Sequence, residues 1–294
     1  MLKPRTMLLI CIQILIFMSE AQAFVSVCDR TILVREALEV FFRRGCGTIT
    51  EKDLLQIERL KIYGGKASEP PLKAGDFDGL REVKLLRLIG SGSGLPSGIF
   101  SGLDKLETLT IEDSKLSIIP DDMFSKLENL KWLVFERNHI RKVSERAFSG
   151  MPKLEMLAMQ LNRIGLLPHR LFPDTSFVAT VSLYGNEISR LPEGFFTGLP
   201  RLKELLLTRN KLKRLPDKLF VGLTALLTLD LEKNLLKTIP AQILTDLPNL
   251  RRINLDQNPI DPSELRKLKA LLGDKLSFCS RPGKKCDRVG GSMR

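Results

Sequence analysis

Residues 199–220 read LPRLKELLLTRNKLKRLPDKLF, and the spacing of the apolar residues in this stretch decides the fold. Leucines occupy its first position and the positions three, six, eight, thirteen and sixteen residues later. The same spacing recurs along the chain, in units of which most are 24 residues long. The units begin at Leu54, Leu80, Leu103, Leu127, Met151, Thr175, Leu199, Leu223 and Leu247. Self-similarity of this kind is typical of repeat proteins, in which each unit stacks on its neighbours.

Each unit predicts a short strand followed by a turn that holds an asparagine. If the first residue of a unit is called offset 0, the apolar residues at offsets 6 and 8 share one face of a strand, since alternate side chains point the same way. Offset 11 is occupied by Asn138, Asn162, Asn186, Asn210, Asn234 and Asn258, whose side chains can satisfy buried backbone groups. Gly65, Ser91 and Ser114 take that place in the earlier units, which predicts a looser N-terminal third.

Proline and phenylalanine recur in the remainder of each unit. An apolar–proline step such as Leu215-Pro216 favours extended backbone before an irregular turn. Offset 21 holds Phe124, Phe148, Phe172, Phe196 and Phe220, and Phe77 stands at the equivalent place of the longer first unit. Phe100 joins this column if its unit lacks one residue. Stacked rings predict a second column of core residues. The recurrent prolines and the absence of a helical period disfavour a helical repeat or a coiled coil.

Together these positions resemble the typical 24-residue subclass of leucine-rich repeats, LxxLxxLxLxxNxLxxLPxxxFxx, from Leu54 to Ile260. That subclass occurs in extracellular receptors and in secreted bacterial proteins. The segments CDRTILVR (28–35) and KAGDFDGL (73–80) are in addition similar to the N-terminal region of exported bacterial repeat proteins. The resemblance implies an α/β repeat solenoid, a curved horseshoe with a parallel sheet on its concave face and helical N-terminal and C-terminal caps.

Residues 1–23 are predicted to be a secretory signal peptide. Lys3 and Arg5 precede the apolar run Met7–Met18, and Ala21-Gln22-Ala23 fits a cleavage site. A transmembrane anchor is the alternative, but the run is short against the roughly 20 residues that a span requires. The protein is therefore expected to be secreted or periplasmic, with no membrane span.

Three further parts follow the signal peptide. Residues 24–60 are expected to form an N-terminal cap that merges into the first repeat, residues 54–260 to hold eight units and a terminal partial unit, and residues 261–294 to form a C-terminal cap and tail. We expect cap helices over residues 34–44 and 51–57, the second starting after Thr50 with Asp53 in its first turn. Asp261 and Pro262 predict the start of a C-terminal helix that Gly273 ends.

Four cysteines remain after removal of the signal peptide: Cys28, Cys46, Cys279 and Cys286. Their even number and their position at the two ends predict structural disulfides in an oxidising compartment. A zinc site is disfavoured because no histidine lies near either pair. Eight strand steps of about 4.8 Å separate the ends of the predicted stack by roughly 40 Å, whereas bridged Cα atoms lie within about 7 Å. We therefore predict the pairs Cys28–Cys46 and Cys279–Cys286.

The chain is strongly basic. Its formal charge is +12, and loss of Lys3, Arg5 and Glu20 with the signal peptide leaves +11. Basic residues gather after the asparagine column, at Lys115, His139, Arg141, Lys142, Arg163, Arg190, Lys211, Lys213, Arg214 and Lys237. This flank favours an acidic glycan or an anionic surface as a possible partner. Nucleic acid is not expected, since the chain shows no platform of interleaved aromatic and basic residues.

Offsets 5, 7 and 9 are predicted to face outward from the concave sheet. The only tryptophan of the chain falls there, beside Val134, Met156 and Ala158, and Tyr184 lies two strands further on. Exposed aromatic and methionine clusters are typical of binding hot spots, although scattered apolar residues are common on protein surfaces. The candidate ligand-binding residues are Trp132, Val134, Met156, Tyr184, Leu206 and Glu136.

Acidic residues share one column of the same face, at Glu112, Glu136, Glu232 and Asp256. We interpret this column as a solvated stripe and not as a cation site, because calcium ligands usually converge from one loop. Glu112 and Glu136 on adjacent strands have the approximate spacing of a glycosidase pair, but no walled pocket is predicted around them.

No catalytic residue, cofactor or metal is predicted. His139 and His169 fall on repeat loops, and no free cysteine remains if both disulfides form. The sequence therefore predicts a secreted recognition module, not an enzyme, that binds a protein ligand through its concave face. The alternatives are a glycan or polyanion binder that uses the basic flank, and a structural or adhesive surface protein.

Peptide mapping without reduction tests the predicted cysteine pairing. Digestion of residues 24–294 should yield disulfide-linked peptides that join Cys28 to Cys46 and Cys279 to Cys286, because the stack separates the two ends. Mass spectrometry before and after reduction identifies the linked peptides. A peptide that joins Cys46 to Cys279 would contradict both the pairing and the linear stack.

Overall fold

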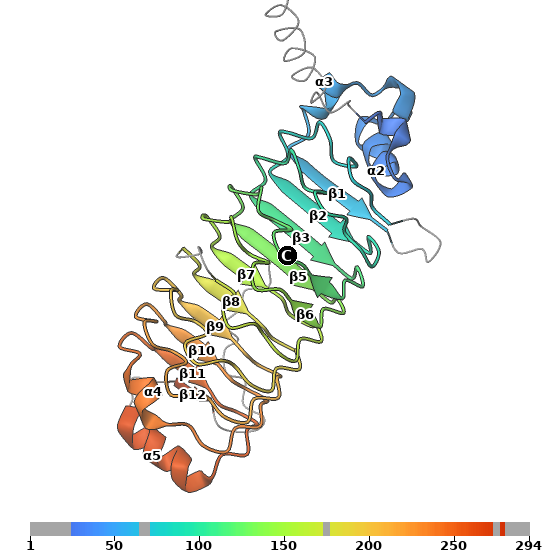
Figure 1. Cartoon of the computed structure of the whole chain (residues 1–294). Coiled ribbons are helices and arrows are strands. Elements are labelled where there is room, and N and C mark those ends of the chain that lie inside the picture. The colour runs from blue at the N-terminus through green and yellow to red at the C-terminus, as the bar shows by residue number, and fades with distance from the viewer. Residues whose placement is uncertain (1–24, 65–70, 173–176, 273–276, 280–294) are drawn as a thin grey trace, which may run out of the picture.

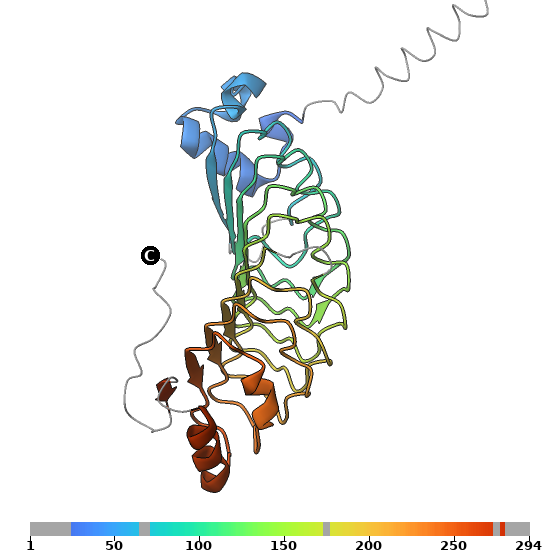
Figure 2. The same cartoon turned by 90° about the vertical axis from the view of Figure 1, so that its left-hand side faces the viewer.

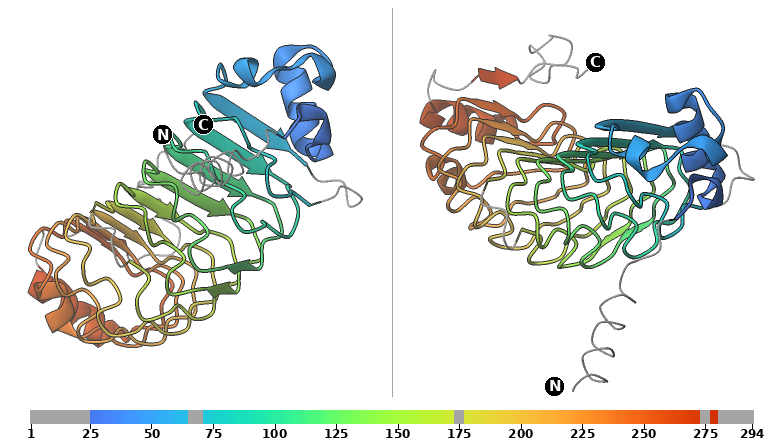
Figure 3. Two further views of the ribbon diagram at one scale, coloured as in Figure 1. Left: turned by 45° about the horizontal axis from the view of Figure 1, so that its top comes forward. Right: turned by 90° about the horizontal axis from the view of Figure 1, so that it is seen from above.

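The computed structural model describes residues 25–64, 71–172, 177–272 and 277–279, which form a parallel β-solenoid (Figure 1). Successive turns stack along one axis, and the stack curves so that a sheet lines its inner side while irregular loops form its outer side (Figure 2). The view from above shows the same arc, with the N-terminal helices at one end and the C-terminal helices at the other (Figure 3). The predicted curved solenoid with a parallel concave sheet is confirmed.

The concave sheet has ten strands within the described residues, and its spatial order follows the chain. The strands are β1 (Arg59–Tyr63), β2 (Leu85–Ile89), β3 (Thr108–Glu112), β5 (Trp132–Glu136), β7 (Met156–Ala158), β8 (Thr180–Ser182), β9 (Glu204–Leu206), β10 (Thr228–Asp230), β11 (Arg252–Asn254) and β12 (Ser277–Cys279). A separate parallel pair, β4 (Ile118–Ile119) and β6 (Lys142–Val143), lies outside this sheet. Neighbouring strands pair in register, so equivalent offsets form straight columns across the face.

Inward strand residues and the phenylalanine column form a continuous core. Leu205 and Leu207, at offsets 6 and 8 of their unit, are fully buried. The rings of Phe77 and Phe100 stack with centroids 6.2 Å apart, and the ring of Phe124 follows 5.6 Å beyond Phe100. Phe100 therefore belongs to the column. Alternate burial along the strands and ring stacking along the axis both repeat with the unit, so the core grows one layer per turn.

The asparagine column joins each turn to the one before it. The Asn162 amide donates to the carbonyl of Phe135 in the preceding unit at 2.8 Å, and its carbonyl oxygen accepts from the amide of Ile140 at 3.1 Å. The same pair of contacts recurs at Asn186, Asn210, Asn234 and Asn258. Each side chain satisfies backbone groups that the bend leaves without strand partners, as buried polar groups require.

The expected loosening of the N-terminal third is wrong at Ser91 and Ser114. Both serines are buried, their hydroxyl oxygens lie 3.0 Å apart, and the Ser91 amide donates to the Ser114 hydroxyl. The Ser114 amide in turn donates to the side chain of Asn138, which joins the serines to the asparagine column. A hydroxyl can replace the amide here because it both donates and accepts. Gly65 lies outside the described residues.

Two helices and a disulfide build the N-terminal cap. Helix α2 (Ile32–Phe42) starts two residues before the predicted range, and α3 (Glu51–Leu54) is shorter than predicted. Short 3-10 helices span Val27–Asp29 and Cys46–Thr48. Thr50 and Asp53 form a capping box at the start of α3, as their spacing indicates. The predicted disulfide between Cys28 and Cys46 is present.

The cap is attached to the first complete repeat by a buried aspartate. The Asp76 carboxylate accepts from the amide and the hydroxyl of Thr31, at 2.8 and 2.9 Å, and the Arg30 guanidinium donates to the Asp76 carbonyl at 2.7 Å. These contacts join the segments 28–35 and 73–80, which the sequence singles out separately. Burial lowers the pKa of Arg30, and the charges of Asp78 and Asp76 oppose that shift.

The C-terminal end carries helices α4 (Ala241–Thr245) and α5 (Pro262–Leu272). Helix α5 begins where Asp261 and Pro262 predict, and the Asp261 carboxylate accepts from the Ser263 amide at 2.7 Å. Leu268 of α5 is buried against the end of the core. Gly273, Cys286 and the signal peptide lie outside the described residues. Among the described helices, none is long and apolar enough to cross a membrane.

Replacing a buried asparagine should destabilise the whole stack. Asn162→Ala leaves the Ile140 amide and the Phe135 carbonyl without partners, so we expect the free energy of unfolding to fall by about 2–4 kcal/mol. Urea unfolding followed by circular dichroism measures the change. Asn129→Ala is the matched control, because Asn129 is only half-buried and its hydrogen bonds to Asp104 and Lys153 lie at the surface. Equal losses in the two variants would contradict a special role for the buried column.

Candidate functional site

The strand register brings three of the predicted binding residues together on the concave face. Trp132 of β5 lies beside Met156 of β7, and Val134 lies beside Ala158 on the same two strands. The Trp132 side chain is 43% exposed, whereas Val134 and Met156 are half-buried and Ala158 is almost fully buried. We call Trp132, Val134 and Met156 the apolar patch. An exposed indole packed beside half-buried apolar side chains is a suitable anchor for a binding partner.

Tyr184 and Leu206 lie apart from the apolar patch. Tyr184 follows β8, two strands from β5 in the sheet order, and occupies offset 9, whereas Trp132 and Met156 occupy offset 5 at the opposite ends of their strands. The Arg209 guanidinium lies over the Tyr184 ring, 5.7 Å from its centroid. Leu206 of β9 is half-buried between Ser182 and Asp230 on the adjoining strands. The predicted residues thus form two zones of one face.

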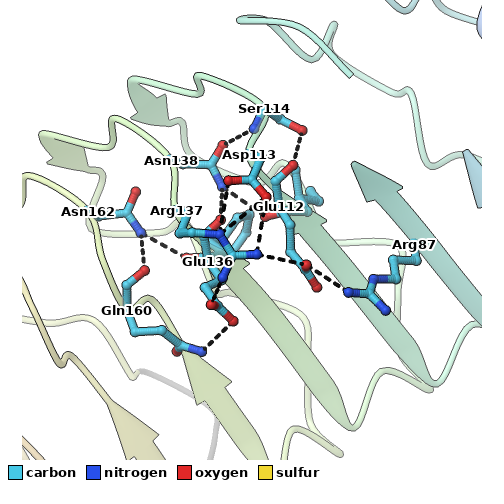
Figure 4. A network of polar contacts seen from close by, with 11 residues as sticks. Arg87, Glu112, Asp113, Ser114, Glu136, Arg137, Asn138, Gln160 and Asn162 are labelled. Carbon is cyan, nitrogen blue, oxygen red and sulfur yellow. Dashed lines mark hydrogen bonds and ion pairs between the residues drawn. The ribbon is translucent and has the colours of Figure 1, made fainter. Parts of the chain in front are cut away.

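A network of charged residues borders the apolar patch (Figure 4). Arg137 stands at its centre, and its guanidinium pairs with Asp113 at 3.0 Å, with Glu112 at 3.5 Å and with Glu136. Glu112 also accepts from Arg87 at 2.8 Å. Gln160 extends the network by donating to Glu136 at 3.2 Å. Hydrogen bonding to Asp113 raises the pKa of Arg137, and hydrogen bonding to Glu112 raises that of Arg87.

The backbone conformation of Arg137 lets it reach three carboxylates. Its φ is 51°, in the left-handed region that non-glycine residues rarely adopt. Asp113 and Leu161, at the same offset in the adjoining units, share this conformation. Left-handed backbone at the strand end turns the side chain back along the sheet, toward the preceding unit. Charge-assisted hydrogen bonds to Asp113 and Glu112 offset the conformational cost.

This network corrects the interpretation of the acidic column as a solvated stripe. Glu112 is only 7% exposed and is paired with two arginines, so it is part of the folded structure. Glu136 shares Arg137 with Glu112, so both acids considered as a glycosidase pair are engaged in ion pairs. Sequence reasoning missed the network because it treated the columns separately. The signal was present, since Arg87, Glu112 and Arg137 occupy offsets 7, 9 and 10 of three successive units.

A second acidic group lies near the C-terminal end of the concave face. Glu232 accepts from Asn254 and Gln257 at 3.1 and 3.2 Å, and pairs with Lys233 at 3.3 Å. Burial first, and then the charges of Glu232 and Asp230, raise the pKa of Asp256. In the described part of the chain, no group of three or more histidine, cysteine or acidic side chains is arranged to hold a metal ion.

The repeats are similar in sequence to a known protein family and in fold to a solved structure. A family model described as Leucine rich repeat matches residues 90–139, 104–164, 176–233 and 200–260. The crystal structure of a TLR13–ssRNA13 complex is similar to this chain, with 29% sequence identity and a TM-score of 0.64. The match covers 71% of this chain but only 30% of that one. No curated protein matches the sequence significantly.

Asp256 should make stability depend on pH in a defined direction. Its folded-state pKa is raised, so its ionisation opposes folding above that pKa, and the penalty disappears as the pH falls. We expect Asp256→Asn to raise the free energy of unfolding at pH 7 and to leave it unchanged near pH 3. Urea unfolding at both pH values measures the difference.

A carboxyl titration followed by nuclear magnetic resonance supplies the control for this variant. Glu232→Gln removes a neighbouring negative charge and should lower the pKa of Asp256 toward its ordinary value. If Asp256→Asn destabilises the protein at pH 7, the interpretation of this acidic group is wrong.

Proposed function

The chain belongs to the leucine-rich repeat family, and we propose that it is a recognition module that binds a protein ligand across its concave face. The apolar patch around Trp132 is the centre of the proposed site. Tyr184, Leu206 and Glu136 extend it along the sheet. Repeats of this family typically serve as protein-interaction modules, and their parallel sheet offers a continuous surface many residues wide.

The observation that carries this proposal is the exposure of Trp132. The side chain is 43% exposed although apolar neighbours, Met156 and Val134, lie directly beside it. An indole held in this way presents a large apolar surface to water, which a partner can cover with little loss of conformational entropy. Tryptophan is also among the residues enriched in binding hot spots.

The charged network supports the same site from one side. Arg137 and its carboxylate partners are paired within the protein, so a ligand meets polar groups whose positions are already set. Preorganised groups reduce the entropic cost of association. They also give the apolar patch a polar border on that side, as the polar rims of protein interfaces do. We therefore expect contacts to this rim to add specificity more than affinity.

Localisation outside the cytoplasm is consistent with this role. The Cys28–Cys46 disulfide indicates an oxidising environment. Together with the predicted signal peptide, it supports a secreted or periplasmic protein. The similar TLR13 structure contains single-stranded RNA. For this chain we favour a protein ligand, because the exposed aromatic residue sits among apolar neighbours and not among the cations that nucleic acid requires.

Binding assays with concave-face variants test the proposal. Residues 24–294 would be used to capture partners from surface and secreted extracts at low and high salt, and the affinity of each purified partner would then be measured. We expect Trp132→Ala to weaken binding by about tenfold or more, since hot-spot truncations cost about 2 kcal/mol. High salt should change this affinity only mildly, because apolar contacts dominate.

Leu166→Ala is the matched control, because Leu166 is 52% exposed but lies on a loop outside the concave sheet. It should leave affinity unchanged. Tyr184→Ala examines the second zone of the face separately. If partners bind the Trp132→Ala variant with unchanged affinity and dissociate at high salt, the proposal that the concave face binds protein is wrong.

A further inference from the structure

A strip of basic residues runs along one lateral edge of the solenoid, where each chain segment leaves the concave sheet. We call it the basic edge. Its members are exposed and occupy offsets 12, 14 and 15 of successive units: Lys115, His139, Arg141, Lys142, Arg163, Arg190, Lys211, Lys213, Arg214 and Lys237. None of them belongs to the apolar patch or to the charged network around Arg137.

Backbone hydrogen bonds hold the basic edge at a regular spacing. The amide of His139 donates to the Leu116 carbonyl at 2.8 Å, and the amide of Arg163 donates to the Ile140 carbonyl at 2.9 Å. Lys211 repeats this contact further along the stack. The buried asparagines next to these residues join the same turns from inside. The side chains thus project from a rigid ladder whose step is the strand spacing, about 4.8 Å.

The positive charge of the basic edge is largely uncompensated. The segments 115–118, 139–142, 163–166, 187–190, 211–214 and 235–238 contain a single acid, Glu187. Glu187 pairs with Lys211 at 2.8 Å, and its pKa is lowered by that contact and by the charges of Arg141 and Arg163. One carboxylate therefore faces several basic side chains, and the positive charge of this edge exceeds its negative charge.

The opposite lateral edge, where the chain enters the strands, shows that this repeat can pair its basic side chains with acidic ones. In the N-terminal units of that edge, lysines pair with glutamates of the preceding unit, in the pairs Lys84–Glu58, Lys105–Glu82 and Lys131–Glu107. Further along it, Lys153, Lys203 and Arg251 are exposed. Both edges are built by the same repeat, so the repeat alone does not require bare cations. The row of nine lysines and arginines on the basic edge, against the single acid Glu187, points to a ligand that supplies negative charge there.

Acidic columns bound the basic edge on both sides. Glu112, Glu136, Glu232 and Asp256 lie on its concave side, and Asp121, Glu145, Glu193 and Asp217 follow it toward the convex side. A broad anionic surface such as a membrane would also contact these acidic columns, and the like charges would repel each other. A narrow, linear polyanion would contact the cations alone. From Lys115 to Lys237 the strip covers five repeat steps, or about 24 Å.

We propose that the basic edge binds a linear acidic polysaccharide, sulfated or rich in uronate, laid along the stack and separate from the concave protein-binding face. Its charged groups would contact exposed lysines and arginines from several successive turns at once. Nucleic acid fits the strip less well, because no tryptophan, tyrosine or phenylalanine stands among the cations to stack with bases.

Heparin oligosaccharides are the probe for this proposal, with fluorescence anisotropy as the readout at low and physiological salt. The triple variant Arg141→Gln, Arg163→Gln and Lys213→Gln should lower affinity for a heparin oligosaccharide longer than the strip by about tenfold or more. The slope of log affinity against log salt should fall by about three, one for each cation removed. A heparin disaccharide should bind far more weakly than the long fragment, since it reaches few turns.

The control removes the same charge from the other edge, with Lys153→Gln, Lys203→Gln and Arg251→Gln, which are exposed there. This variant should stay within about twofold of the wild type, because charges beyond a Debye length are largely screened at physiological salt. Equal losses in the two triple variants would overturn the proposal, since only net charge would matter. So would the absence of heparin binding at physiological salt, and so would tighter binding of a charge-matched single-stranded RNA.

Discussion

The hydrogen bonds of the asparagine column are the constraint on which the rest of the structure depends. Each side chain binds a carbonyl and an amide of the preceding turn, as Asn162 does with Phe135 and Ile140. Both contacts form only if every turn places the asparagine at the same depth, so the unit length can vary only outside the strand and its bend. In-register strand pairing and the stacked phenylalanine rings then follow from one repeated geometry.

Such a rigid ladder separates the stability of the fold from the composition of its surface. Inward residues are occupied by the core, and outward offsets are free to carry apolar, charged or neutral side chains. The same frame therefore presents the apolar patch on the sheet and uncompensated cations on one lateral edge. These surfaces favour different ligands, because apolar contacts resist salt while an array of exposed cations does not.

Arg137 shows how one side chain specialises a conformation that the units share, since Asp113, Leu161 and Arg209 have the same left-handed backbone at this offset. It adopts left-handed backbone at an offset where glycine would do so without strain, as Gly185 does two units later. Its guanidinium in return gathers carboxylates from its own and the preceding unit, and Glu112 becomes a buried ion-pair partner. The concave face thus combines regular columns with a locally specialised charged network next to Trp132.

The sequence by itself determined the repeat, the inward and outward faces of each strand, the Cys28–Cys46 pair and the capping box at Thr50, because each depends on residues close together or on a strict period. Only the tertiary structure decided the pairing of Glu112 with Arg87 and Arg137, and the separation of Tyr184 from the apolar patch. Those features depend on the reach of particular side chains across three turns, which neither the repeat period nor a single column encodes.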